Sequence, residues 1–390
     1  MLVVKLSAIG DVTHTLPALT TIRRHQPDAR ITWLVEDTAH DVIRGHAALD
    51  RILVWRRREW TEIVRSFRWV SATRLLAGFI RELRNTHYDL IIDFQALLKG
   101  SVWVALARGQ RKAGYGPGLR HDERSYLFLS ERVPVADPSA HAVERNLRLL
   151  EGLGFPRVPL RYDFPILPEN DAEASRLLSE LDLGDHSPFV GINAMTRWPT
   201  KNWTPENFAA VADALADGGV PCVFTGAAAD REALDAVAGA MRTPPRRLEG
   251  RTSLKTLAAV FRRALVVLST DTGPMHIAVA VGTPVVALFG PTSPGYTGPY
   301  GEGHIVLRAG VECSPCYNRV CETRRYEPHA CMRRLQPGDV VEAVRRRLEL
   351  GRSAPPRTVH PEADGASPPE RGRLVRTRPS TGETPALPGA

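Results

Sequence analysis

The strongest constraint on the fold is an alternation of short β-branched strands with helical segments, which occurs twice along the chain. In the first half, strands are expected at 2–6, 30–35 and 88–93. In the second half, strands are expected at 189–193, 220–225, 264–269 and 284–289. Strands that alternate with helices form parallel sheets built from βαβ units. The chain is therefore expected to be an α/β protein with two sheets.

A proline-rich stretch separates the two halves. It contains Pro156, Pro159, Pro165 and Pro168. We expect one domain at 1–165 and a second at 166–350, closed by a helix at 337–350. From Gly351 onward proline and glycine are dense and apolar residues are sparse, so the segment cannot bury enough surface to offset its ordering entropy. A disordered tail is expected at 351–390.

Length and composition agree with two cores of ordinary size, because 43% of the 390 residues are apolar. The first six residues run directly into a serine and a glycine turn, without the long apolar stretch of a signal peptide. No segment approaches the roughly 20 consecutive apolar residues of a membrane-spanning helix. A cytoplasmic location is expected.

The formal net charge of +8 predicts attraction to polyanions such as nucleic acid, anionic lipid or phosphorylated small molecules. The segment 55–69 places five arginines among three tryptophans. This pattern is typical of a surface that meets an anionic membrane or headgroup, and it is equally typical of a solvated amphipathic helix. No nucleic-acid-reading module is recognisable, so nucleic acid is not an expected partner.

The turn after the first strand carries a candidate catalytic carboxylate, Asp11. The dinucleotide fingerprint G-x-G-x-x-G is missing here. A bound diphosphate about 4 Å from Asp11 would be repelled by roughly 4 kcal/mol at an effective dielectric near 20. A carboxylate on such a loop is better suited to act as a general base. The alternative is that Asp11 only caps a helix.

A second candidate turn, in the other half of the chain, follows a buried strand and opens a helix. Gly273 allows close backbone approach, and Pro274 suits the first helical turn. The free amides, the helix dipole and the Thr272 hydroxyl together favour an anion. Asp271 can accept a hydrogen bond from a sugar hydroxyl, and His276 lies one turn into the helix. The alternative is a tight turn with a hydrogen-bonded histidine.

A third candidate follows the strand at 189–193. Thr196 and Lys201 lie where they can neutralise a departing diphosphate. Taken alone, however, a single lysine before a helix is usually just a surface residue.

Together these segments resemble glycosyltransferase family 9, the lipopolysaccharide heptosyltransferases. The opening match is Lys5-Leu-Ser-Ala-Ile-Gly-Asp-Val-Thr-His through Leu19. Further matches, in the family's order, are 88–99, 141–145, 201–203, 271–276 and 289–294. The resemblance covers about residues 1–350.

The resemblance implies a GT-B fold, in which two Rossmann-like domains face each other across a cleft. It also implies an ADP-heptose donor and inversion at the anomeric carbon. Asp11 corresponds to the catalytic base, Asp230 to the residue that holds the nucleoside ribose, and Arg58 to a basic position linked to the anionic acceptor. The remaining donor contacts are Ser7, Thr196, Lys201, Asp271, Thr272, Gly273 and His276.

The implied reaction moves heptose from ADP-heptose onto the inner core of lipopolysaccharide, with peripheral contact at the inner face of the inner membrane. No cofactor or metal is expected, since the chain contains no Asp-x-Asp. The alternative is a related glycosyltransferase that uses another nucleotide sugar or a protein acceptor. The stretch 120–124 does not align cleanly with the family's arginine, so the acceptor, and whether the first or second heptose is transferred, stay open.

Four of the five cysteines lie close together in the sequence, at Cys313, Cys316, Cys321 and Cys331. In a cytosolic protein this density suggests a structural metal more than disulfides. The gaps of four and nine residues are irregular for a zinc ribbon. A structural metal, reduced thiols and a redox pair all remain open.

Overall fold

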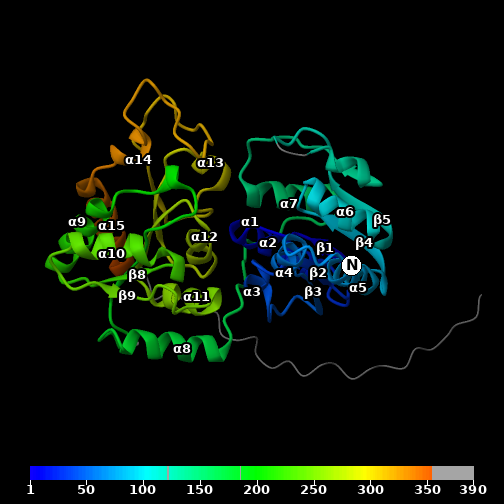
Figure 1. Ribbon diagram of the computed structural model, residues 1–390, viewed down its shortest axis with the longest axis horizontal. Coiled ribbons are helices and arrows are strands. Elements are labelled where there is room, and N and C mark those ends of the chain that lie inside the picture. Colours follow the sequence, from blue (N-terminus) through cyan, green and yellow to red (C-terminus); the bar gives the residue numbers. More distant parts are fainter. Residues whose placement is uncertain (121–122, 185, 354–390) are drawn as a thin grey trace, which may run out of the picture. The chain divides into compact units, whose positions relative to one another are not determined.

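The computed structural model describes residues 1–120, 123–184 and 186–353, and residues 1–351 form one compact unit (Figure 1). It contains two six-stranded sheets in which all paired strands are parallel. This confirms the expected α/β class with two sheets.

The first sheet has the order β3-β2-β1-β4-β5-β6. Its strands are β1 (Leu2–Val4), β2 (Thr32–Glu36), β3 (Arg51–Trp55), β4 (His87–Asp93), β5 (Arg108–Tyr115) and β6 (Glu131–Val133). The helices of this half are α1 (Ile9–Thr13), α2 (Leu16–His25), α3 (His40–Ile43), α4 (Arg57–Arg65), α5 (Trp69–Arg84), α6 (Leu98–Leu106), η1 (Ser125–Phe128) and α7 (Ala142–Gly152).

The second sheet has the order β12-β11-β10-β7-β8-β9. Its strands are β7 (Val190–Asn193), β8 (Cys222–Thr225), β9 (Arg246–Arg247), β10 (Val266–Thr270), β11 (Val285–Leu288) and β12 (Ile305–Leu307). The helices are α8 (Pro168–Ser179), η2 (Pro199–Lys201), α9 (Pro205–Asp217), η3 (Ala228–Asp230), α10 (Arg231–Ala240), α11 (Leu254–Arg263), α12 (Gly273–Ala280), α13 (Pro294–Thr297), α14 (Ala330–Arg333) and α15 (Pro337–Ser353).

Both strand orders reverse once, between β1 and β4 in the first sheet and between β7 and β10 in the second. Open parallel sheets bind ligands beyond the carboxyl ends of the strands at such a reversal. The turn with Asp11 follows β1, the segment with Thr196 follows β7, and the turn with Asp271 follows β10. The three candidate segments therefore all lie at reversal points.

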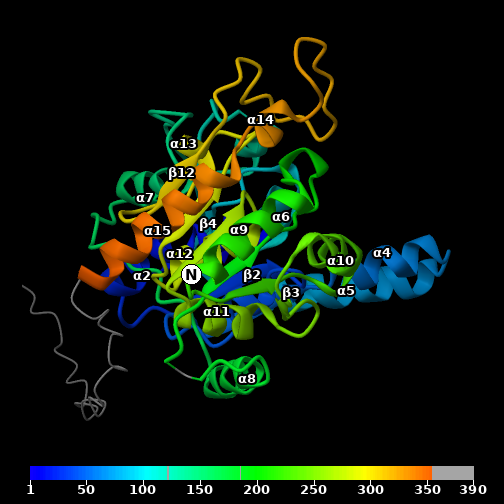
Figure 2. The ribbon, with the colours of Figure 1, turned by 90° about the vertical axis from the view of Figure 1, so that its left-hand side faces the viewer.

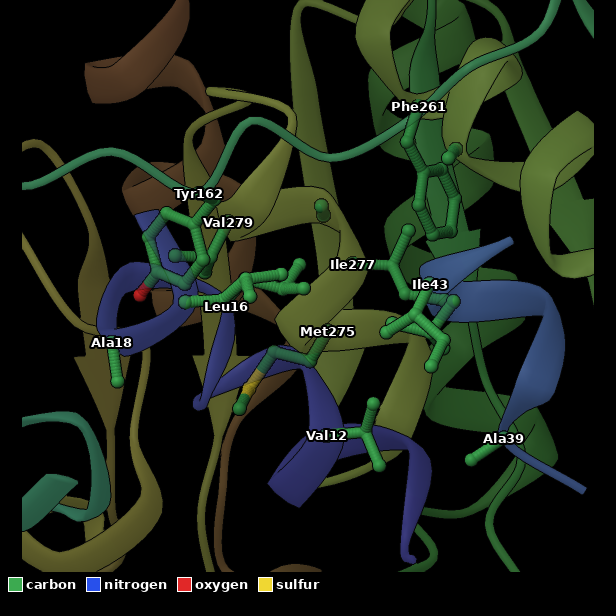
Figure 3. Packing of buried hydrophobic residues seen from close by; sticks show 14 of the residues in the cluster. Val12, Leu16, Ala18, Ala39, Ile43, Tyr162, Phe261, Met275, Ile277 and Val279 are labelled. Atoms are coloured by element: carbon green, nitrogen blue, oxygen red, sulfur yellow. The ribbon is translucent and has the colours of Figure 1, made fainter. Parts of the chain in front are cut away.

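The hydrophobic core is continuous between the two halves. One cluster of buried side chains includes Val12 and Leu16 from the first half and Met275, Ile277 and Val279 from α12. Figure 3 shows these side chains packed against one another. Two further clusters occupy the opposite sides of the sheets, one in each half. The shared cluster fixes α1 and α2 against α12.

The proline-rich stretch between α7 and α8 forms neither helix nor strand over 153–167. It is nevertheless well anchored. Tyr162 is buried in the shared core, and Lys255 Nζ donates a hydrogen bond of 2.6 Å to the carbonyl of Pro165.

At the C-terminal end of the described chain, α15 reaches Ser353, three residues beyond the expected helix end at Leu350. The rest of the expected tail, from 354 onward, lies outside the described residues. None of the helices in the described part of the chain has both the length and the apolar character needed to cross a bilayer.

Candidate active site

Asp11 occupies the third position of α1, just after β1. Its Oδ2 accepts a hydrogen bond of 3.0 Å from the backbone N–H of Ala8. The side chain therefore caps α1, as the simpler interpretation of the sequence expects. This contact engages one carboxylate oxygen, and Asp11 remains only half-buried. A partly accessible carboxylate at this edge of the sheet can also accept a proton.

The loop before α1 is held by side chains from neighbouring strands. Gln95, after β4, accepts hydrogen bonds at Oε1 from the backbone N–H groups of Leu6 (2.9 Å) and Ser7 (3.3 Å). Lys99 Nζ donates to Ser7 Oγ at 2.6 Å and lies 3.7 Å from Glu36 Oε1. None of Gln95, Lys99 and Glu36 is a predicted site residue, although Gln95 and Lys99 lie within the matched segment 88–99. Glu36 ends β2, Gln95 lies two residues beyond β4, and Lys99 is in the first turn of α6.

Two buried charged groups lie beneath this loop. Lys5 is 8% exposed, and its Nζ donates a hydrogen bond of 2.9 Å to the carbonyl of Phe94. Burial lowers the pKa of Lys5, while the charges of Asp11 and Asp93 raise it. Burial raises the pKa of Asp93 to about 6. Lys5 and Asp93 thus place two buried groups of opposite charge type next to the loop that carries Asp11.

On the second sheet, Lys201 and Asp271 form a buried ion pair. Lys201 Nζ lies 2.6 Å from Asp271 Oδ2, and the two side chains are 14% and 6% exposed. The Thr292 hydroxyl donates to the same carboxylate oxygen at 2.6 Å. Lys201 also lies over the Trp198 ring, 4.4 Å from its centroid. Three N–H groups are available on the ammonium, so pairing with Asp271 leaves donors that can bind an anion.

The helices α1 and α12 meet at two glycines. A Cβ on Gly10 would lie 2.5 Å from His276 Cδ2, and a Cβ on Gly273 would lie 3.1 Å from the Ile9 Cβ. Any larger residue would separate the helices. Gly273 therefore has a packing role in addition to the close approach to a ligand expected from the sequence. This contact brings α1, which carries Asp11, against the N-terminus of α12, as Figure 1 shows.

Three histidines lie together where the two halves meet. His14 Nε2 and His276 Nδ1 are 3.0 Å apart, and the rings of His14 and His141 meet edge to face at 5.2 Å. His141 Nε2 donates to the carbonyl of Gly298 at 2.9 Å and its ring stacks on Tyr300. Burial lowers the pKa of His14 and His276, and it lowers the pKa of His141 to about 4. All three are therefore neutral near pH 7.

His276 is thus a buried, hydrogen-bonded residue, as the simpler interpretation of its turn expects. The charges of Asp271, Asp11 and Lys201 lie around it and act on its pKa. The structure therefore brings four of the expected residues to one place. They are Asp11, Lys201, Asp271 and His276.

The other expected residues lie around this centre. Thr272 precedes α12, and among the described residues its side chain makes no capping hydrogen bond. The backbone N–H of Thr196 donates to Asn202 Oδ1 at 3.0 Å. Asp230, after β8, accepts from the backbone N–H of Ala227 at 2.7 Å and lies one strand away from the reversal point.

Arg58 is in the first turn of α4, where its backbone N–H donates to Asp37 Oδ2 at 3.2 Å. Its side chain is exposed. Its neighbour Arg57 connects to the centre through Glu36, since Arg57 Nη1 and Lys99 Nζ both lie within 4 Å of that carboxylate.

Residues 76–327 match the family model of glycosyltransferase family 9 (heptosyltransferase). That match covers more than half of the chain. The chain belongs to glycosyltransferase family 9. Lipopolysaccharide heptosyltransferase 1 from Pseudomonas aeruginosa is 30% identical over 362 residues, which cover 87% of this chain and 96% of that protein. The protein of the same name from Escherichia coli K12 is 30% identical over 325 residues, with coverages of 80% and 94%.

Solved structures of the family share the fold. The Escherichia coli heptosyltransferase WaaC with ADP superimposes with a TM-score of 0.71 and 27% identity, covering 89% of this chain and 99% of that one. A family 9 structure from Veillonella parvula gives a TM-score of 0.77 at 24% identity, covering 90% and 97%. The expected GT-B architecture is therefore confirmed.

The family 9 chain also contains a cysteine-lined cavity of about 230 Å³. Its walls include His329 together with Cys313, Cys316, Cys321 and Cys331. The four thiols are unpaired, and Cys321 Sγ accepts a hydrogen bond from the backbone N–H of His329. Within the described ranges, no three His, Cys, Asp or Glu side chains are arranged to hold a metal ion.

Proposed function

We propose that this glycosyltransferase moves heptose from ADP-heptose onto the anionic inner core of lipopolysaccharide, with inversion at the anomeric carbon. The observation that carries the proposal is the contact between α1, which contains Asp11, and α12, together with the charges of Asp11, Asp271 and Lys201 around His276. Support also comes from relatives named lipopolysaccharide heptosyltransferase and from WaaC structures with ADP and with ADP-2-deoxy-2-fluoro heptose.

Asp11 is proposed as the general base. It takes the proton from an acceptor hydroxyl while that oxygen attacks the anomeric carbon of the heptose. The bond between that carbon and the diphosphate oxygen breaks at the same time, so the electron pair leaves with ADP. Attack from the side of α1 and departure toward α12 invert the configuration, because the two groups lie on opposite sides of the sugar.

The developing charge on ADP is proposed to be stabilised by the N-terminus of α12 and by Lys201. Both donors are already fixed, the helix by its apolar contacts with α1 and Lys201 by Asp271. This arrangement supplies the stabilisation that a divalent cation provides elsewhere, so the proposed reaction is metal-independent. The other donor contacts are proposed at Ser7, Thr196, Asp230, Asp271, Thr272, Gly273 and His276.

We assign residues 1–165 to acceptor binding, with Arg58 as an anion contact, and residues 166–350 to binding of the nucleotide sugar. The chain would act from the cytoplasmic side in peripheral contact with the inner membrane.

The direct test is transfer measured with ADP-heptose and a purified inner-core acceptor, following both ADP release and the mass of the acceptor. Thermal stabilisation by ADP, but not by UDP, NAD or DNA, is expected in parallel. Transfer only from another nucleotide sugar, or only to a protein acceptor, would replace this proposal with the related-transferase alternative. Stabilisation by NAD or DNA alone would contradict a glycosyl-transfer function.

A further inference from the structure

The turn between α4 and α5 exposes an apolar cluster at its tip. All six residues of 65–70 are exposed, and Phe67, Trp69 and Val70 have exposed fractions of 79%, 57% and 72%. Phe67 and Val70 are the two most exposed large apolar side chains in the described residues. The rings of Phe67 and Trp69 lie edge to face, with their centroids 6.4 Å apart. Single exposed apolar residues are ordinary, but three within four positions are a patch that marks an interaction site.

The three tryptophans of the segment 55–69 therefore divide into two groups. Trp55 is 7% exposed and packs on Phe79 and Trp103, and Trp60 is half-buried against Trp55. These two belong to the core of the first half. Only Trp69 faces solvent, so the aromatic residues that can meet a partner are at the tip and not along α4.

The backbone of the turn directs this cluster outward. The Arg68 N–H donates to the carbonyl of Ile63, and the Phe67 N–H donates to that of Val64. Phe67 has a φ of +56°, a left-handed conformation that such helix ends usually reserve for glycine. An aromatic residue is held here in a less favourable conformation and with its ring in solvent. If the turn had only a structural role, glycine at position 67 would adopt this φ at a lower energetic cost and would expose no apolar ring to solvent.

Positive charge surrounds the cluster. Residues 56–74 contain six arginines and two glutamates. In the part of the chain that the structure describes, four guanidinium groups of this segment form no ion pair. They belong to Arg58, Arg65, Arg68 and Arg74. A second copy of the same tip would be repelled by these charges. An anionic lipid surface is attracted to them and accommodates tryptophan and phenylalanine at its headgroup boundary.

The position of the helical hairpin formed by α4 and α5 fits a lipid-linked acceptor. Figure 2 shows α4 and α5 side by side, projecting from the first half with their shared turn at the far end. The base of α4 connects to the active site through Arg57, Glu36 and Lys99. Nine residues of helix span about 13 Å. The tip therefore lies about 13 Å along α4 from Arg57, whose side chain contacts Glu36.

We propose that the tip formed by Phe67, Trp69 and Val70 inserts into the headgroup region of an anionic bilayer, with Arg65, Arg68 and Arg74 beside it bound to lipid phosphates. The proposal rests on the proposed function, whose acceptor is anchored in a membrane, and it names the part of the chain that makes the membrane contact. Its test does not depend on turnover.

The experiment is co-sedimentation of the full chain with vesicles of phosphatidylglycerol and phosphatidylethanolamine, and with vesicles of phosphatidylcholine alone. The wild type should bind the anionic vesicles, bind phosphatidylcholine at least tenfold more weakly, and dissociate as salt is raised. The double variant Phe67→Ser/Trp69→Ser should lose about tenfold in affinity for the anionic vesicles. Val320→Ser is the matched control, because Val320 is 68% exposed in the second half of the chain, and it should bind like the wild type.

A second readout separates this proposal from the proposed function. With a water-soluble, deacylated acceptor, the double variant should keep the wild-type kcat/KM, whereas its rate with acceptor embedded in anionic vesicles should fall. Equal vesicle binding by the wild type and the double variant would overturn the proposal. A change in oligomeric state in the double variant would overturn it in favour of self-association, and competition by single-stranded DNA at equal charge would overturn it in favour of nucleic acid.

Discussion

Gly10 of α1 and His276 of α12 are in such close contact that a Cβ on residue 10 would lie 2.5 Å from the His276 Cδ2. The imidazole cannot move away freely, because its Nδ1 is 3.0 Å from His14 Nε2 and the residue is 6% exposed. Two residues far apart in the sequence thereby set the distance between the proposed base and the proposed donor loop.

Replacing Gly10 with alanine should push α1 and α12 apart. Overpacking of this kind costs about 1–3 kcal/mol, so the melting temperature should fall by several degrees and kcat should fall with it. Gly78→Ala is the matched control, since Gly78 lies within α5 and, among the described residues, a Cβ there would meet nothing within 4 Å beyond its own helix. Alanine should stabilise that helix by up to about 1 kcal/mol. Wild-type stability and turnover in Gly10→Ala would show that the helices are not tightly coupled.

Replacing Asp11 with asparagine should abolish turnover and preserve the fold. Asparagine can still accept the Ala8 N–H, but it cannot take a proton, a function worth a factor of about a hundred to ten thousand. ADP affinity, measured by titration on the same preparation, should change little. Asp230→Asn is the comparison, because Asp230 makes the same kind of cap with Ala227; it should raise the donor KM and leave kcat near the wild-type value. Normal turnover in Asp11→Asn would show that Asp11 is only a helix cap and not the base.

Breaking the pair of Lys201 and Asp271 should affect stability and catalysis separately. Lys201→Met leaves a carboxylate that is 6% exposed without its counter-ion, a change that costs about 3–5 kcal/mol when the pair is fully buried. Adding Asp271→Asn removes that charge and should restore most of the melting temperature. Turnover should stay low in the double variant, because the cation facing the leaving group is still missing. Recovery of both stability and kcat would assign Lys201 a structural role only.

The buried histidines predict a loss of stability on mild acidification. His141 has a folded-state pKa of about 4 against an ordinary value of 6.5, and burial lowers the pKa of His14 and His276 as well. Between pH 6.5 and about 4 the unfolded chain therefore binds more protons than the folded chain, so stability falls as pH falls. Asp93, with a pKa raised to about 6, acts in the opposite direction over pH 6 to 3.8.

Denaturant titrations across this range measure the balance. Burial also lowers the pKa of His46 and of His304 to about 4, so the lowered histidines together should outweigh the one raised aspartate. His141→Gln retains a donor for the Gly298 carbonyl but does not titrate, so its stability should depend less steeply on pH. An unchanged slope would mean that His141 is already protonated or accessible in the folded protein.

Chelation should leave the transfer rate unchanged in a short assay, because Lys201 and the N-terminus of α12 are proposed to stabilise the departing diphosphate. Initial rates with and without EDTA measure this directly. An immediate loss that magnesium restores would refute the proposed leaving-group chemistry. A slow loss over hours would instead implicate the cysteine-lined cavity, and replacing its four cysteines with serine should then remove that slow phase.

Local patterns predicted the buried parts of the fold well and the exposed parts poorly. The apolar run at 264–269 is β10, shifted to Val266–Thr270, and the run at 220–225 contains β8. In contrast β5, which reads Arg-Gly-Gln-Arg-Lys-Ala-Gly-Tyr, is buried only at its last three residues and has no strand-like alternation. Its place in the sheet depends on pairing with β4, which is a long-range contact.

The candidate site divides in the same way. Asp11, Lys201 and Asp271 are recognisable because contiguous motifs carry them at the ends of predicted strands. Glu36 is not, and Gln95 is not identified as a site residue by the matched segment around it. Their roles come from a hydrogen bond to the loop after β1 and an ion pair to α6, which no local spacing encodes.

The amino-acid sequence alone was sufficient for the α/β class, for seven of the twelve described strands and for the family, because these follow from hydrophobic periodicity and from short motifs read along the chain. Tertiary structure alone decided which side chains meet. His14 bonds to His276 across 262 positions, Lys201 pairs with Asp271, and Trp55 enters the core while Trp69 stays in solvent. These outcomes depend on how two separately formed sheets pack and exclude water, and burial of that kind is a property of the whole assembly of elements rather than of any one of them.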